Sequence, residues 1–121
     1  MAYTNAAKDA AVNAIRALLT SNIGYVSLHT ADPGTTGASE ATGTAYARGS
    51  STFPSASGGT GSTGGQASVT ARTGSTTAAT HVGIWTAVSA GTFVCGIALS
   101  VTENFSTAGG TLLYTPTLSA S

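Results

Sequence analysis

The chain has 121 residues, which is one domain's worth of sequence and enough to enclose a single core. Only 7% of the residues are charged, and four basic and four acidic side chains leave no net charge. Nucleic acid and anionic membranes attract clustered Lys and Arg, so this balance gives no electrostatic basis for binding either. Charge also keeps monomers apart, so a nearly neutral surface indicates packing against copies of the chain or against another protein.

The N-terminal segment predicts one amphipathic helix from residue 5 to about residue 19. Thr4 or Asn5 can cap its start, and apolar side chains follow at helical spacing: Ala11, Ile15, Leu18 and Leu19. Polar residues interrupt the apolar run, so the segment does not resemble a signal peptide, and no stretch reaches the ~20 apolar residues of a membrane span. We therefore expect the protein to fold in the cytoplasm of the cell that makes it.

After residue 22 the apolar residues recur at every second position, which predicts strands. These are YVSLHTA, QASVTAR, THVGIWTAV and GTFVCGIALSV, the last with Phe93, Cys95, Ile97, Leu99 and Val101 on one face. A further strand is expected in GGTLLYTPTLSAS, at an edge or with a bulge, because Pro116 cannot donate to a central ladder. The lone Cys95 has no disulfide partner in the chain and is expected to be a buried apolar thiol.

Short strands separated by Gly/Ser/Thr-rich turns predict an antiparallel β-sandwich or jelly-roll-like barrel preceded by one α-helix. We expect a single domain over residues 1–121, with a helical segment at 1–22 and a β domain at 23–121. The low-complexity segment 54–65 predicts a flexible loop, which would be ordered only by something outside its own fold. It contains GTGSTG, but a strand pattern follows where a dinucleotide-binding loop needs a helix.

The residues that could combine for chemistry are few: His29, Asp32, Glu40 and His81. A metal site or a Ser-His-Asp set needs side chains that converge from neighbouring strands, and nothing in the spacing forces that. The sequence Asp32, Pro33, Gly34 is simpler to interpret as a turn, in which the Asp side chain bonds backbone amides and Gly accepts positive φ. His29 is then a solvated or interface residue. We expect no catalytic residue, metal site or cofactor, and no enzyme activity.

Three residues are candidate contacts to a partner. Arg48 and Arg72, on presumed strands, are candidates for an acidic partner surface. Trp85, the sole tryptophan, suits a subunit interface or a sugar-binding surface if it points outward, and a core position if it points inward. A receptor- or carbohydrate-binding module would use Trp85, Tyr46 or Tyr114 as a stacking platform.

Two stretches, YVSLHTADPGTTGASEATGTAYARGSSTF and THVGIWTAVSAGTFVCGIALS, resemble a known group of proteins. Together with the alanine-rich helix, they are similar to small virion structural proteins of tailed bacteriophages, particularly those of actinobacterial hosts. Members are labelled minor capsid, decoration or tail-fibre-like proteins. The shared features are the LHTADPG turn, the YAR strand at 46–48, the HVGIW strand and the GTF hairpin at 91–93, and they cover most of the chain.

The resemblance implies a non-enzymatic building block of the virion, assembled by symmetry in many copies. Our main prediction is a head decoration protein that binds the major capsid protein as a homotrimer and reinforces the lattice. Long fibres usually need repeats or coiled-coil stretches, and neither is present in the sequence. The alternative is a tail, tail-fibre or baseplate component, or a receptor- or carbohydrate-binding β module.

Overall fold

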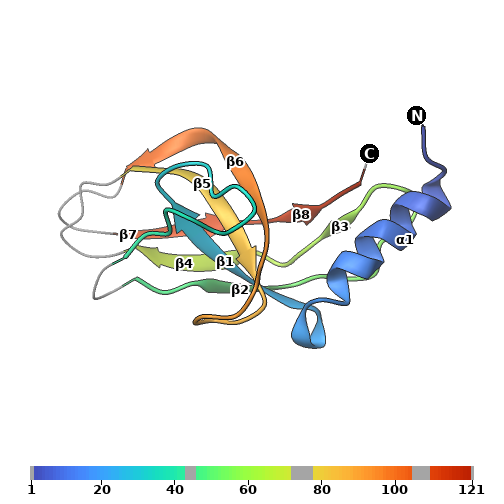
Figure 1. The fold of residues 1–121 in the computed structure, drawn as a ribbon, viewed down its shortest axis with the longest axis horizontal. Helices are drawn as coiled ribbons and strands as arrows, with labels where there is room; N and C mark the ends of the chain where they lie inside the picture. The colour runs from blue at the N-terminus through green and yellow to red at the C-terminus, as the bar shows by residue number, and fades with distance from the viewer. Residues whose placement is uncertain (1, 43–45, 72–77, 105–109, 121) are drawn as a thin grey trace.

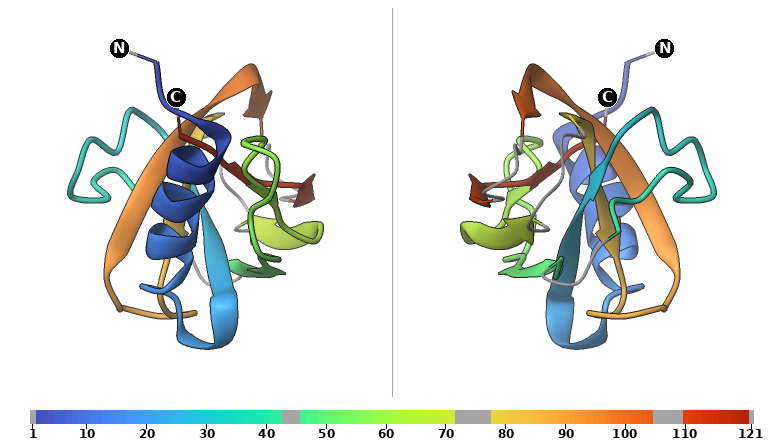
Figure 2. Two further views of the ribbon diagram at one scale, coloured as in Figure 1. Left: turned by 90° about the vertical axis from the view of Figure 1, so that its right-hand side faces the viewer. Right: turned by 90° about the vertical axis from the view of Figure 1, so that its left-hand side faces the viewer.

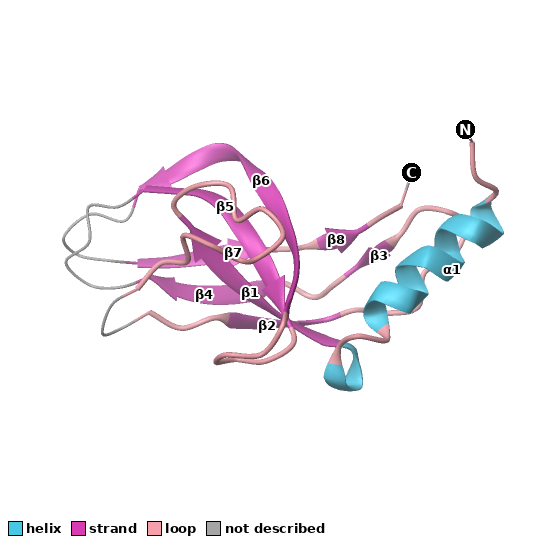
Figure 3. Ribbon diagram, viewed as in Figure 1, coloured by secondary structure: helices cyan, strands magenta, loops and turns pink. Residues whose placement is uncertain are grey.

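One helix precedes a series of antiparallel strands in the computed structural model, which describes residues 2–42, 46–71, 78–104 and 110–120 (Figures 1 and 3). The helix α1 covers Asn5–Arg16, and a 3-10 turn covers Thr20–Asn22. The strands are β1 (Ile23–His29), β2 (Gly49–Thr52), β3 (Ser62–Thr63), β4 (Ala67–Ala71), β5 (Ala78–Trp85), β6 (Phe93–Asn104), β7 (Gly110–Tyr114) and β8 (Thr117–Leu118). The mainly β fold with an N-terminal helix is therefore confirmed. No helix in the described part of the chain has the length and hydropathy to cross a membrane.

The strands form a β-sandwich-like body that is open along one side. A four-stranded sheet has the order β2-β1-β5-β6, and two-stranded sheets pair β4 with β7 and β3 with β8. An isolated bridge between Ala47, just before β2, and Thr70 in β4 joins the large sheet to the β4–β7 pair. Around the body the order is thus β6-β5-β1-β2-β4-β7, and β6 and β7 stand at its two ends (Figure 2).

The core lies between the inner face of the large sheet and the β4–β7 pair. Its centre comes from alternate positions of β1, β4 and β5, all buried: Val26, Leu28, Val69, Val82 and Ile84. In β6, the expected inward side chains of Cys95, Ile97 and Leu99 are half-buried, as the alternation predicts.

Two residues of the predicted β6 face do not follow the alternation. A register shift after Ile84 pairs Trp85 with Phe93, so Phe93 lies on the outer face, where its ring meets His29 and Trp85. A second shift, between Ala79 and His81, takes β6 out of register near Val101, whose side chain is 68% exposed. Sequence period alone could not place these shifts, because each bulge inverts the faces beyond it.

The helix is shorter than predicted and buries only part of the predicted stripe, together with Val12. Thr4 Oγ1 caps the start by accepting from Ala7 N, and the helix ends at Arg16. Val12 and Leu19 are buried and Ile15 is half-buried, whereas the predicted Ala11 and Leu18 are exposed. The stripe differs because α1 lies at the end of the body (Figure 1) and uses polar side chains to hold a neighbouring loop.

The glycine-rich segment 54–65 is held by the chain itself, which corrects the expectation of an external partner. Asn13 Oδ1 of α1 accepts from Ala56 N at 3.0 Å, and Asp9 Oδ1 accepts from Gly59 N at 2.9 Å. Arg16 Nε donates to the carbonyl of Phe53 at 3.0 Å. The polar side of the helix therefore replaces the partner that the low-complexity sequence was expected to need.

Pro116 divides the expected last strand into two, and β7 lies at a sheet edge, which was one of the two predicted positions. The strand pattern breaks between β7 and β8, and Pro116 itself is buried. Its carbonyl accepts from Gly64 N at 2.9 Å, so the proline is tied to the start of the β3–β4 segment without having to donate.

Candidate functional site

The segment 30–42 returns across the outer face of the large sheet (Figure 1). It starts with the Asp-Pro-Gly turn, in which Asp32 Oδ1 accepts from Gly34 N at 2.9 Å and Gly34 has a φ of +59°. Backbone hydrogen bonds then join Thr30 N to Ser39 O and Ala41 N to Leu28 O. The turn thus sends the chain back along the end of β1. We call this segment, residues 30–42, the return loop.

Glycines allow the return loop to approach the sheet closely. Gly37 has a φ of +77°, and a Cβ there would come within 2.6 Å of the Trp85 ring. Gly96 of β6 faces the buried Pro33 in the same way. Both contacts require glycine for space, and at Gly37 the backbone conformation requires it as well.

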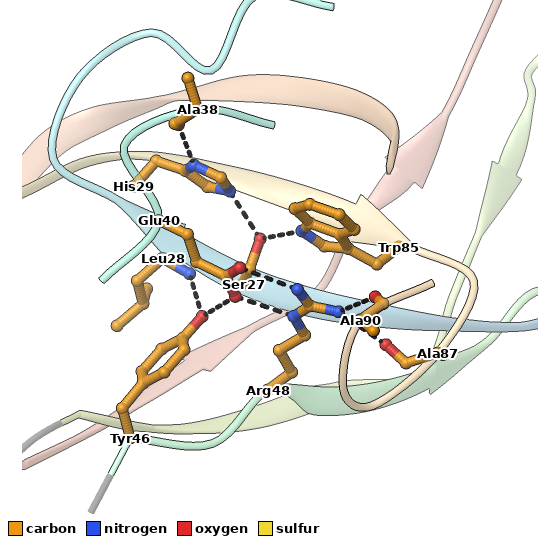
Figure 4. A network of polar contacts seen from close by, with 10 residues as sticks. All are labelled: Ser27, Leu28, His29, Ala38, Glu40, Tyr46, Arg48, Trp85, Ala87 and Ala90. Atoms are coloured by element: carbon orange, nitrogen blue, oxygen red, sulfur yellow. Dashed lines mark hydrogen bonds and ion pairs between the residues drawn. The ribbon is translucent and has the colours of Figure 1, made fainter. Parts of the chain in front are cut away.

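A chain of hydrogen bonds fixes His29 beneath the return loop (Figure 4). His29 Nδ1 lies 2.7 Å from the carbonyl of Ala38, which only accepts, so Nδ1 carries the proton. The neutral Nε2 then accepts from Ser27 Oγ at 2.7 Å, and that oxygen accepts from Trp85 Nε1 at 2.8 Å. In this series of hydrogen bonds, every donor therefore has an acceptor only while His29 is neutral.

The environment of His29 favours that neutral form. Its side chain is fully buried, so the expected solvated or interface position is wrong. Burial lowers the pKa of His29 and outweighs the hydrogen bond to Ala38 and the nearby Glu40 carboxylate, which act to raise it. The charge of Arg48 and the nearby His81 also lower the pKa of His29.

The second half of the network centres on Arg48. Its guanidinium bonds both carboxylate oxygens of Glu40, each at 2.8 Å, and donates to the carbonyls of Ala87 and Ala90 at 2.9 and 2.8 Å. The group also stacks on Trp85, with Cζ 4.0 Å from the ring centroid. Arg48 thus joins the return loop to the turn between β5 and β6, whereas the sequence assigned it to a partner surface.

Tyr46 completes the Glu40 site. Its hydroxyl donates to Glu40 Oε2 at 2.7 Å and accepts from Leu28 N at 3.1 Å. Burial acts to raise the pKa of Glu40, but the hydrogen bonds from Arg48 and Tyr46 outweigh it and lower that pKa. Burial, with the Glu40 carboxylate, raises the pKa of Tyr46. The pKa of Arg48 is raised, chiefly by its hydrogen bonds to Glu40.

We call the hydrogen-bonded network around His29 and Arg48 the clasp. Its arrangement suits a structural role better than a reaction centre. Ser27 and His29 have the separation of a nucleophile and its base, but both side chains are fully buried and Trp85 already donates to the serine oxygen. Asp32 lies apart in its exposed turn, while His81 pairs in register with His29. Among the described residues, no three His, Cys, Asp or Glu side chains gather to hold a metal ion.

The other predicted contact residues have varied positions. Trp85 lies on the outer face of the large sheet, half-buried between Arg48, Phe93 and Ser27, so it is neither a core residue nor an open platform. The Tyr46 hydroxyl is bonded to Glu40, and Tyr114 lies on a different strand, β7. Arg72 lies outside the described residues.

Sequence reasoning missed Ser27 and the pairing of Glu40 with Arg48. Only eight residues in the chain carry a formal charge, so opposite charges eight positions apart around a turn were an available signal. Ser27 and His29 share one face of a strand by simple alternation. The prediction wrongly assumed that this face was solvated, because the return loop that covers it is irregular.

A family model described as podophage GP4 fiber I protein gp80 matches residues 2–121. The chain belongs to this fibre-protein family. The match includes the helix, the return loop and the network around Arg48. Membership in the fibre-protein family makes the chain a bacteriophage virion structural protein, as the sequence resemblance predicted at that level. A search of curated proteins finds no match.

The fibre-protein family favours the alternative prediction over the main one. Its description names a fibre protein and neither a head decoration protein nor an actinobacterial host. The argument against a fibre relied on missing repeats and coiled-coil stretches, and a globular β unit needs neither when it is one part of a larger assembly.

Proposed function

We propose that the protein is a structural unit of a phage tail fibre, joined to copies of itself and to other virion proteins. The family match over residues 2–121 is the observation that carries this proposal. The role is assembly, with no catalytic step, and it needs neither nucleic acid nor a membrane as partner.

The charge distribution supports assembly through neutral surfaces. Glu40 and Arg48 neutralise one another, and Asp9 and Arg16 bond the backbone of the same chain. Four of the eight charged side chains are therefore bonded within their own chain. Neutral Ala, Val, Thr and Ser surfaces associate by buried area without the desolvation cost of buried charge.

Repeated copies would strengthen weak individual contacts. A homotrimer is our specific proposal for the first level of assembly, because cyclic symmetry closes an interface between unlike surfaces. Linked contacts in a fibre then bind more tightly than any one of them alone. The clasp around His29 and Arg48 would keep each unit rigid in that array.

Separation of virions into heads and tails tests the proposed location. Antibody against the purified protein should detect it in the tail fraction, and immunogold labels should lie on fibres in electron micrographs. The major capsid protein serves as the marker for carry-over of heads. Detection with heads alone, at constant ratio to that marker, would instead establish the decoration role.

A further inference from the structure

The hydrophobic core is closed on one side of the body and open on the other. On β1 and β5, Val26, Leu28, Val82 and Ile84 have between 0% and 1% exposure. Most of the apolar residues that only partly reach the core lie instead near the gap between β6 and the last two strands: Ile15, Val94, Cys95, Ile97, Leu99, Leu112 and Tyr114. Within the described residues, the core is therefore incompletely covered along this gap.

Two grooves run along the gap, which we call the seam. The first, of about 400 Å³, lies between Leu99 and Val101 of β6 and Leu112 and Leu113 of β7. The second, of about 310 Å³, lies between Cys95 of β6, Leu118 of β8 and Leu18 beyond the end of α1. In the described residues, five large hydrophobic side chains are mostly exposed, and three of them border the seam: Leu18, Val101 and Leu113.

Both sides of the seam are ends of sheets. Among the described residues, β6 pairs only with β5, and β7 only with β4. β6 has twelve residues and spans about 40 Å, which is long enough for an interface of standard size, about 800 Å² per partner. Edge strands of monomers are usually protected by charge or proline, but Glu103 is the only charged residue in the described part of the chain that lines the grooves.

We propose that an adjoining copy of this chain closes the seam, the β6 side of one copy packing on the β7–β8 side of the next. A charged partner would find almost no counter-charge there, whereas this chain offers a neutral surface of the same composition. The two sides of the seam differ, so the contact joins unlike surfaces of neighbouring copies, and a rotation that closes such contacts gives a ring. The inference stands on the geometry of the seam and does not depend on whether the protein lies in a tail or a head.

Paired lysine substitutions test the seam. Val101→Lys places a charge at the seam, and Val88→Lys is the matched control, because Val88 is 58% exposed in the turn between β5 and β6, away from both grooves. We expect the wild-type protein to associate in sedimentation equilibrium and Val101→Lys to associate at least about tenfold more weakly. Val88→Lys should associate like the wild type.

Two further measurements keep the test decisive. Leu113→Lys on the opposite side of the seam should weaken association in the same way, and circular dichroism checks that each variant folds. Cys95, the chain's single cysteine, borders the seam, so its alkylation by iodoacetamide should slow as wild-type protein associates and stay constant in Val101→Lys. A wild type that remains monomeric, association unaffected by both lysines, or alkylation independent of concentration would each overturn the proposal. A protein found on heads would overturn the tail-fibre function and leave this inference standing.

Discussion

Arg48 donates four hydrogen bonds to groups of its own chain and stacks on Trp85. Its side chain is only 7% exposed. Arg48→Ala would leave the Glu40 carboxylate and the carbonyls of Ala87 and Ala90 without their donor. Breaking a buried ion pair costs about 3 kcal/mol of unfolding free energy. Urea denaturation should show a loss of this size.

Arg48→Lys is the conservative comparison for that experiment. Lysine keeps the charge but cannot bond both Glu40 oxygens in a planar fork or stack flat on Trp85. We expect about half of the stability loss to remain in this variant. If Arg48→Ala unfolds within about 0.5 kcal/mol of the wild type, as surface substitutions do, the clasp does not stabilise the fold.

His29 makes the stability of the fold sensitive to acid. Protonation at Nε2 would place a second donor on Ser27 Oγ, which already accepts from Trp85. Because the folded pKa of His29 lies below its ordinary value of 6.5, the unfolded chain binds the extra proton first. Stability should therefore fall as pH drops below about 6.5, with a slope of up to about 1.4 kcal/mol per pH unit, until the folded pKa is reached.

The lowered pKa of Glu40 acts in the same direction at lower pH. Its contribution to stability is present above about 4.5 and is lost as pH falls through the folded value. Thermal unfolding measured from pH 7.5 down to about pH 2 covers both effects. His29→Gln, which cannot titrate, should be less stable at pH 7.5 but flatter between pH 6.5 and 5. An equal slope in that variant would assign the acid sensitivity to another group.

At the scale of elements, the return loop offers a comparison between two glycines with left-handed backbone. Gly34 has a φ of +59° and open space beyond it, whereas Gly37 has a φ of +77° and the Trp85 ring against it. Gly34→Ala adds backbone strain alone, about 1 kcal/mol. Gly37→Ala adds strain and overpacking, roughly 2–4 kcal/mol in total.

Fluorescence of the single tryptophan reports this difference directly, because Trp85 loses its cover only if the loop moves away. A red shift in the Gly37→Ala protein and none in Gly34→Ala would fit the structure. Equal destabilisation of both variants would mean that the loop does not press on the ring.

Asn13 joins the helix α1 to the glycine-rich segment 54–65. Its Oδ1 accepts from Ala56 N and from Arg16 Nη1 at 3.2 Å. Asn13→Ala should cost about 1–2 kcal/mol and speed hydrogen exchange at the Ala56 amide. Asn13→Asp keeps the acceptor, so exchange there should stay slow. Slow exchange in Asn13→Ala would show that other contacts order the segment.

These elements show where sequence reasoning succeeds. Regular alternation predicts the strands, and Pro116 predicts that the last strand lies at an edge or contains a bulge, because both effects are local. The burial of His29 depends on a return loop with no repeating pattern, and the outward position of Phe93 depends on a register shift. Low complexity suggested that segment 54–65 lacks order, yet Asp9 and Asn13 supply its hydrogen bonds from more than forty residues away.

At the scale of the whole molecule, some charged side chains are buried while some large apolar side chains are exposed. Two of the few ion-forming side chains, Glu40 and Arg48, are turned into the chain, while Leu18, Val101 and Leu113 face outward along the seam. A monomer gains nothing from exposed leucine and valine beside open groove walls. The same distribution is favourable once another neutral surface covers the seam.

The salt dependence of association then follows from the chemistry of the seam. Of the described residues, Glu103 is the only charged side chain lining its grooves, so little Coulomb attraction is available there for salt to screen. We expect the association constant to change by less than about twofold between 50 and 500 mM NaCl, because screening acts on charges, and to rise with sodium sulfate, which strengthens apolar burial. Sedimentation equilibrium measures both series. A fall of tenfold or more in NaCl would mean that exposed charges elsewhere on the molecule hold the copies together, whereas insensitivity to NaCl with a rise in sulfate fits an interface made from the uncovered side of the core.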